Sequence, residues 1–238
     1  MTATFSIFSF IIIAYARAKA SAKRIDEILT MDEQATEAVN AKDSERLSSF
    51  AITFDNVSFH YPNTDEPVLQ GMTFAIAHGE KIAVMGATGA GKSTIIQLIE
   101  HFYKATDGTI WINGVPIEQI PIQKLRNSIS YVPQQSILFS GTILDNLRWG
   151  RQDATLEDMY EATHKAQIYD SIVKFEDGFN TIIGQKGVNL SGGQKQRLTI
   201  ARALISQRPI LILDDSLSAL DYQTDLNLRQ ALQKLDCT

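Results

Sequence analysis

Nine consecutive residues, Gly86 to Thr94, have the types and spacing of a phosphate-binding loop. They fit the pattern G-x-x-x-x-G-K-S, in which glycines let backbone N–H groups surround the phosphates of a nucleotide. Lys92 adds a positive charge, and the Ser93 hydroxyl is a suitable ligand for Mg²⁺. The alternative is a chance glycine-rich turn. The residues expected to hold the phosphates are Gly86, Thr88, Gly89, Ala90, Gly91, Lys92, Ser93 and Thr94.

The residues on either side of this loop favour the phosphate-binding interpretation. Lys81 to Met85 has the composition of a buried strand, and Thr94 to Phe102 carries apolar residues at helical spacing. A strand, a glycine loop and a helix in this order direct the N-terminus of the helix at an anion. We therefore expect the loop to join a strand to a helix.

A second candidate anion site lies about a hundred residues later, at Leu190 to Gln194. Ser191 is placed as the N-cap of a helix that carries apolar residues at helical spacing. Gly192 and Gly193, at the start of that helix, leave N–H groups open to an anion. Two such elements in one chain indicate two different nucleotides. By itself this segment is also consistent with a capped helix that has a flexible lead-in.

The composition narrows the class of protein. A length of 238 residues with 44% hydrophobic residues is enough for a substantial core, and the net charge of −5 argues against a nucleic-acid partner. The single cysteine, Cys237, excludes an internal disulfide framework and a zinc–thiolate cluster.

The N-terminal segment is apolar from Thr4 to Ala16 and basic from Arg17 to Arg24. As a helix, residues 1–16 would reach about 24 Å, which is shorter than the roughly 30 Å of bilayer hydrocarbon. A secretory signal peptide would place its positive charges before the apolar run rather than after it. We interpret the segment as the inner end of a transmembrane helix with its basic cluster in the cytoplasm. An ordinary core helix is the alternative.

The remaining elements indicate an α/β domain. In Phe50 to Tyr61, apolar residues alternate with small or polar ones, and the alternation resumes after a one-residue shift. This pattern predicts a half-exposed strand with a bulge. Leu156 to Ala166 has a helical pattern. Further strands are expected at 109–112, 129–132 and 210–213, the last a continuous aliphatic run typical of buried parallel strands. Strands that alternate with helices define the α/β class.

Taken together, the glycine loop, Leu190 to Gln194 and the run from Ile210 to Asp215 closely resemble the nucleotide-binding domain of ATP-binding cassette (ABC) transporters. Residues 14–25 are similar to the exit of the last membrane helix in the exporter branch. The resemblance implies a P-loop NTPase (RecA-like) core with an antiparallel β subdomain and an α-helical subdomain at about 135–190. It implies that the nucleotide-binding domain spans 50–238, after a partial transmembrane helix with its cytoplasmic extension (1–30) and a linker (31–49).

The resemblance also implies roles for individual residues, with ATP and Mg²⁺ as cofactors. Tyr61 corresponds to the aromatic on which adenine stacks, and Gln134 to the glutamine that senses Mg²⁺ and the attacking water. Asp214 corresponds to the carboxylate that holds the Mg²⁺ shell, together with Ser93. Asp221 corresponds to the aspartate that contacts the opposite site of a dimer. Ser191, Gly192, Gly193 and Gln194 would bind the nucleotide of the partner subunit.

Asp215 departs from the family pattern, in which a glutamate positions the hydrolytic water. Aspartate is shorter by one C–C bond, ~1.5 Å, and a displacement of ~1 Å at a catalytic group costs on the order of 100-fold in rate. The resemblance associates this exchange with the degenerate half of heterodimeric exporters. The family's switch histidine also has no counterpart, since none of the chain's four histidines lies beyond Asp221. We therefore expect the chain to be a fragment of a longer polypeptide.

These observations predict an ATP-binding subunit of an ABC exporter in the plasma membrane, with its nucleotide-binding domain on the cytoplasmic side. Its expected partners are a second ABC subunit, the membrane domains of the same transporter and the lipid bilayer, with no nucleic acid. A catalytically weak or silent regulatory or structural cassette is the principal alternative. A soluble cassette protein would not need the apolar N-terminal run, and a GTPase or small-molecule kinase would not need Leu190 to Gln194.

Overall fold

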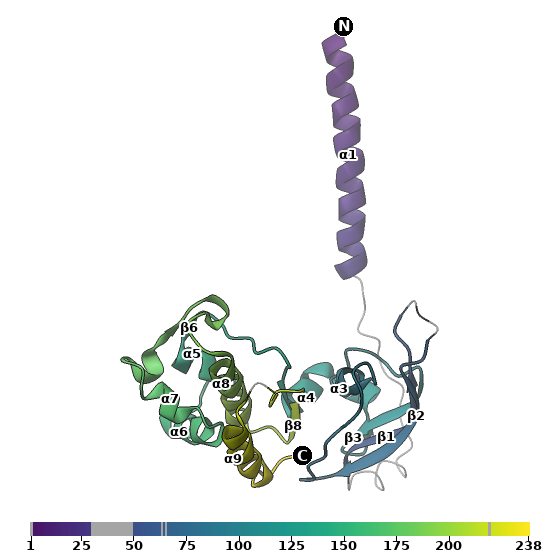
Figure 1. Ribbon diagram of the computed structural model, residues 1–238. Coiled ribbons are helices and arrows are strands. Elements are labelled where there is room, and N and C mark those ends of the chain that lie inside the picture. Colours follow the sequence, from purple (N-terminus) through teal and green to yellow (C-terminus); the bar gives the residue numbers. More distant parts are fainter. Residues whose placement is uncertain (1, 30–49, 63, 65, 219) are drawn as a thin grey trace. The chain divides into compact units, whose positions relative to one another are not determined.

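The computed structural model describes residues 2–29, 50–62, 64, 66–218 and 220–238 (Figure 1). They belong to two compact units, one that contains α1 (Thr2–Leu29) and one that contains every element from β1 onward. The expected linker, residues 31–49, lies outside the described residues.

Helix α1 runs without interruption through the apolar run and the basic cluster. Its apolar side chains are exposed where they are described, with Phe10 at 71% and Tyr15 at 70%. No helix in the described part of the chain has both the length and the apolar character needed to cross a membrane. The interpretation of residues 1–30 as the end of a membrane span stays a prediction.

A four-stranded antiparallel sheet forms the first layer of the second unit, in the order β2-β1-β3-β4. The expected bulge in β1 is confirmed, because the register against β2 shifts between Phe54 and Val57. Asn56 has φ 50° there, and a Cβ at Gly108 would lie 2.3 Å from its carbonyl oxygen, so that position accepts only glycine. Strand β1 is more buried than predicted. The strands are β1 (Phe50–Phe59), β2 (Leu69–Ala77), β3 (Asp107–Ile112) and β4 (Val115–Pro116).

A parallel pair, β5 (Ile129–Val132) and β8 (Ile210–Leu213), forms the centre of the unit, with Val132 opposite Leu213. Both strands occur at the residues predicted for them. The strand predicted at Lys81 to Met85 is wrong: these residues have no strand assignment and are exposed. A strand requires a hydrogen-bonded neighbour. Strand β8 pairs with β5, and its Leu211 N–H donates to the Thr238 carbonyl oxygen (2.8 Å).

Short helices fill the rest of the unit. The predicted helix at 156–166 is confirmed as α6, and the helix after Ser191 as α8. The helices are α3 (Lys92–Ile99), η1 (Ile117–Gln119), α4 (Ile122–Ser128), α5 (Ile143–Arg148), α6 (Leu156–Lys165), α7 (Tyr169–Ile172), η2 (Gly178–Asn180), η3 (Gln185–Gly187), α8 (Gly192–Ile205) and α9 (Tyr222–Gln233). A two-stranded ladder of β6 (Gly141–Thr142) and β7 (Ile182–Ile183) lies between them.

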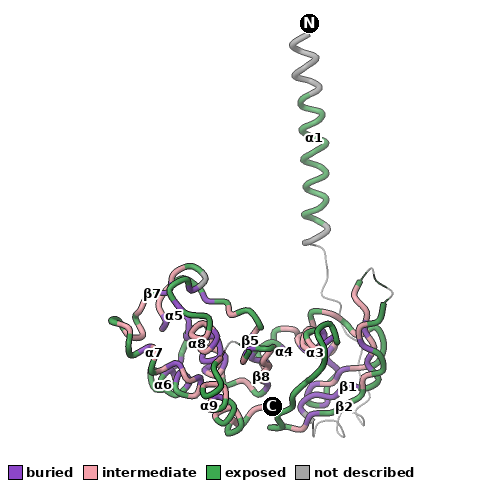
Figure 2. Tube along the Cα trace, in the orientation of Figure 1, coloured by how far each residue is buried: buried purple, intermediate pink, exposed green. Residues whose placement is uncertain are grey.

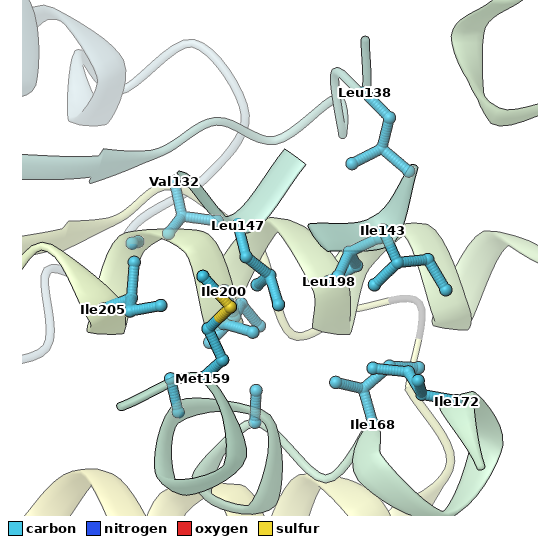
Figure 3. Packing of buried hydrophobic residues seen from close by; sticks show 14 of the residues in the cluster. Val132, Leu138, Ile143, Leu147, Met159, Ile168, Ile172, Leu198, Ile200 and Ile205 are labelled. Carbon is cyan, nitrogen blue, oxygen red and sulfur yellow. The ribbon is translucent and has the colours of Figure 1, made fainter. Parts of the chain in front are cut away.

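Buried hydrophobic residues form two clusters. The buried positions are purple along the chain trace in Figure 2. The first packs α8 against α5, α6 and α7, with Leu198, Ile200 and Leu147 almost fully buried at its centre (Figure 3). The second packs α3 against the antiparallel sheet through Leu98 and Phe54. The two helices whose N-termini were predicted to bind phosphate therefore belong to different cores.

Candidate nucleotide site

The glycine loop wraps around its own lysine. The Lys92 Nζ donates hydrogen bonds to the carbonyl oxygens of Gly86 (2.9 Å) and Ala87 (2.8 Å), so the ammonium lies within the loop. Residues 86–90 are exposed. Gly91 has φ 84°, and a Cβ there would lie 2.9 Å from a methyl group of Leu69, so both the backbone conformation and the space require glycine.

Helix α3 begins directly after the loop, and its N-terminus lacks a side-chain cap. Gly91 is the N-cap residue and makes no capping hydrogen bond. The first N–H groups of a helix need a partner from outside the helix, and an anion satisfies both those donors and the helix dipole. The loop and helix end therefore fit a triphosphate, and the absence of the strand predicted at 81–85 does not alter them.

A hydroxyl and a carboxylate converge beside the loop. The Ser93 Oγ lies 3.4 Å from the Oδ2 of Asp214, which follows β8 directly. The Tyr131 hydroxyl donates to the same Oδ2 at 3.3 Å, a contact that the sequence did not reveal. Burial, followed by the nearby charge of Asp214, raises the pKa of Tyr131 to about 12, so this hydroxyl stays a donor.

The donor set fits Mg²⁺, which prefers hard oxygen ligands and retains phosphate and water oxygens in its shell. Within the described ranges, no three His, Cys, Asp or Glu side chains lie close enough to hold a metal ion among themselves. Ser93 and Asp214 would thus hold Mg²⁺ together with phosphate oxygens.

The Gln134 side chain contacts the Asp215 side chain. Its Nε2 donates to Asp215 Oδ2 at 3.2 Å, so the two residues with predicted catalytic roles contact each other. Asp215 has φ 45°, a left-handed conformation that aspartate tolerates better than most residues. The short acid is consequently held by both its backbone and its amide partner.

Tyr61 lies beside α3, as the predicted adenine contact requires. Its hydroxyl is 3.0 Å from the Thr94 Oγ1 and donates to the Gln97 Oε1 at 2.9 Å. Thr94 is buried, and Gln97 lies one turn further along α3. Sequence reasoning missed the contact with Gln97, because a glutamine at helical spacing is ordinary.

The predicted N-cap at Ser191 is confirmed. Ser191 and Gln194 form a capping box, with the Gln194 N–H donating to the Ser191 Oγ (3.2 Å) and the Ser191 N–H to the Gln194 Oε1 (2.9 Å). A Cβ added at Gly192 would meet open space, so the N-terminus of α8 is accessible. Asp221 caps α9, because its carboxylate accepts a hydrogen bond from the Thr224 N–H. Hydrogen bonds with the backbone and the side chain of Thr224 lower the pKa of Asp221.

Comparison with known proteins identifies the family. The sequence profile described as "ABC transporter" matches residues 69–218, more than half of the chain. The chain belongs to the ABC transporter family. The match contains the glycine loop, Leu190 to Gln194 and the strand β8 that precedes Asp214.

The relatives of this ABC protein include an ABC transporter ATP-binding protein and an ATP-dependent flippase. It is 47% identical over its whole length to the uncharacterised ABC transporter ATP-binding protein YfiB of Bacillus subtilis, covering 41% of that protein. It is 44% identical over 184 residues to the ATP-dependent lipid A-core flippase of Chromobacterium violaceum, covering 77% of this chain and 32% of the flippase.

A solved structure of a bacterial Atm1-family ABC exporter with ATP bound matches 93% of the chain and 39% of its own, at 34% identity and a TM-score of 0.81. The predicted ABC nucleotide-binding fold is confirmed. The chain spans less than half the length of each of these three proteins.

Proposed function

We propose that the chain is the ATP-binding part of one subunit of a heterodimeric ABC exporter, with slow hydrolysis at its own site. The observation that carries this proposal is Asp215 in a chain that keeps Ser191 to Gln194 intact. ATP binding is supported by the Lys92 ammonium inside the glycine loop and by the Ser93–Asp214 pair. The loop would bind the β and γ phosphates of ATP. Ser93 and Asp214 would hold Mg²⁺, with Gln134 as a further residue that would contact the ion.

The dimer is inferred from the second candidate anion site, at Leu190 to Gln194. Ser191, Gly192, Gly193 and Gln194 open the N-terminus of α8, which packs in a different core from α3. An anion bound there completes the site of another subunit, and Asp221, at the start of α9, contacts that same partner. Two ATP molecules would then lie between two cassettes.

The slow site follows from Asp215. Its carboxylate is one bond shorter than that of the family's glutamate and already accepts a hydrogen bond from Gln134. ATP would bind normally, while the water that attacks the γ-phosphate would lack a correctly placed base. The partner's site, completed by the intact Ser191 segment, would carry out most of the turnover.

The membrane attachment rests on α1. Its exposed apolar residues precede Arg17, Lys19, Lys23 and Arg24, the order expected at the cytoplasmic end of a membrane helix. The proposed location is the plasma membrane, with the nucleotide-binding domain in the cytoplasm and membrane domains of the same transporter as partners.

The test compares two alanine variants in the intact heterodimeric transporter, with Asp153→Ala as the control because the Asp153 side chain is 90% exposed. Asp215→Ala is expected to leave most ATP turnover, and Ser191→Ala to remove most of it. The proposal is wrong if Asp215→Ala abolishes turnover while Ser191→Ala leaves it intact. Full-speed hydrolysis by two identical copies would equally contradict it.

The contact between Gln134 and Asp215 also supports a second candidate, a nucleotide-binding cassette that is catalytically silent. In that case the chain would bind ATP, and no partner would elicit hydrolysis. Measuring ATP binding and partner-dependent turnover in the same preparation separates the two candidates.

A further inference from the structure

The Tyr61 side chain is held both by hydrogen bonds to its hydroxyl and by aromatic contacts to its ring. The hydroxyl hydrogen-bonds with both Thr94 and Gln97 on α3, at 3.0 and 2.9 Å. The ring packs edge-on against Phe59 (centroids 5.0 Å apart) and Tyr103 (5.3 Å). A tyrosine at the end of a strand has two rotatable side-chain bonds, and these four contacts select one orientation.

The backbone at Tyr61 is fixed in the same way. Its carbonyl oxygen accepts hydrogen bonds from both the N–H (3.2 Å) and the Oγ1 (3.0 Å) of Thr64, which closes a turn around Pro62. With the backbone set by this turn, the hydroxyl contacts decide where the ring lies relative to α3.

The contacts join two parts of the nucleotide site. Thr94 belongs to the phosphate loop, and Gln97 lies one helical turn beyond Lys92 and Ser93. The helix that directs its N-terminus at the phosphates therefore also holds, through one hydroxyl, the aromatic ring expected to stack on the base.

We propose that Gln97 is a positioning residue for base recognition, because with Thr94 it fixes the Tyr61 ring through the ring's hydroxyl. This inference rests on the proposed binding of ATP to the glycine loop. Without the tether, the ring samples several rotamers and loses part of its stacking on adenine, while the phosphate contacts are unchanged. Affinity for a nucleotide then falls, and affinity for a bare triphosphate does not.

The experiment measures the dissociation constants of MgATP and of inorganic tripolyphosphate with Mg²⁺, by competition against a fluorescent ATP analogue. Gln97→Met keeps the side-chain length and removes the acceptor, whereas Gln97→Glu keeps an acceptor oxygen. Tyr61→Phe removes the hydroxyl from the other side of the bond. Tyr103→Phe is the matched control, since the Tyr103 hydroxyl makes no hydrogen bond within the described ranges while its ring contact remains.

Gln97→Met and Tyr61→Phe are each expected to weaken ATP binding about 3- to 10-fold, the effect of one neutral hydrogen bond, with tripolyphosphate binding changed less than about 2-fold. The double variant is expected to lose no more than Tyr61→Phe alone, because Tyr61→Phe already removes the hydrogen bond to Gln97. Gln97→Glu is expected to restore ATP binding to within about 2-fold, and Tyr103→Phe to match the wild type.

Two results would overturn the inference: a Gln97→Met protein with the wild-type preference for ATP over tripolyphosphate, or losses that add in the double variant. A wild-type protein that binds neither ligand would contradict the proposed nucleotide site itself. If Gln97→Met does not fold, judged by its thermal transition, Tyr61→Phe decides between the same outcomes.

Discussion

Lengthening the acid at position 215 is expected to speed ATP hydrolysis at this subunit's site. Asp215→Glu restores the methylene that separates this chain from the family pattern and moves the carboxylate toward the γ-phosphate. The Gln134 amide, 3.2 Å from the present carboxylate, is mobile enough at its two terminal bonds to keep its contact with the longer side chain.

The expected gain follows from geometry. One C–C bond is ~1.5 Å, and a displacement of ~1 Å at a catalytic group costs on the order of 100-fold, or ~2.7 kcal/mol of activation free energy. The backbone opposes part of this gain. Residue 215 has φ 45°, where glutamate is less favourable than aspartate, so strain of about 1 kcal/mol reduces the expected increase to roughly 10- to 100-fold.

The assay is single-turnover hydrolysis of radiolabelled ATP in the assembled transporter with the partner's site inactivated, so that chemistry is separated from binding and only this subunit's site contributes. Asp215→Asn is the matched control, because asparagine tolerates the left-handed conformation and can still contact Gln134 but cannot act as a base. We expect Asp215→Glu to be fastest and Asp215→Asn slowest. Equal rates for Asp215→Glu and the wild type, with unchanged thermal stability, would refute the argument that chain length limits this site.

Three further changes test other parts of the site and its scaffold. Lys92→Ala is expected to weaken ATP binding at least 10-fold in a nucleotide titration, because a charge-assisted contact is lost and the loop carbonyls lose their donor. Burial, opposed by Arg126, raises the pKa of Glu100 from 4.5 to about 7, so its favourable contribution is present below pH 4.5 and disappears as the pH rises through 7. Glu100→Gln should therefore raise the free energy of unfolding at pH 8 by about 1–2 kcal/mol after solvent screening, seen as a higher melting temperature. At pH 4.5 it should give no gain. Gly150→Ala would place a Cβ 2.2 Å from the Arg202 carbonyl oxygen, so it is expected to lower the free energy of unfolding by about 1–3 kcal/mol in a denaturant titration. Gly178→Ala is the comparison variant, because a Cβ there meets open space and the only strain comes from its φ of 52°.

The elements that could be predicted from the sequence are those whose pattern lies within a few consecutive residues. The strand at 210–213 is four aliphatic residues ended by two acids, and the strand at 129–132 is ended by Pro133, so their bounds were clear. Ser191 followed three residues later by Gln194 is a capping-box pattern, and the structure has that box. Each of these predictions depends on a few neighbouring residues alone.

The remainder depends on contacts between distant residues. Lys81 to Met85 has the composition of a strand, but composition cannot supply the hydrogen-bonded neighbour that a strand needs. Strand β2 lacks a clean alternation and is defined by its pairing with β1. The contacts of Tyr131 with Asp214 and of Tyr61 with Gln97 join residues 83 and 36 positions apart, which no local pattern encodes.

The loop that begins at Gln134 connects the proposed chemical site to α8, whose N-terminus is the proposed second anion site. Gln134 contacts Asp215 at one end of this loop, and two residues later the Ser136 hydroxyl donates to the Gln196 Oε1 on α8 at 3.1 Å. Arg202, further along α8, donates to the Ile137 carbonyl oxygen at 2.8 Å. These three hydrogen bonds lie within a four-residue stretch of backbone, residues 134–137, so the residue that contacts Asp215 and the residues that contact α8 belong to one short segment.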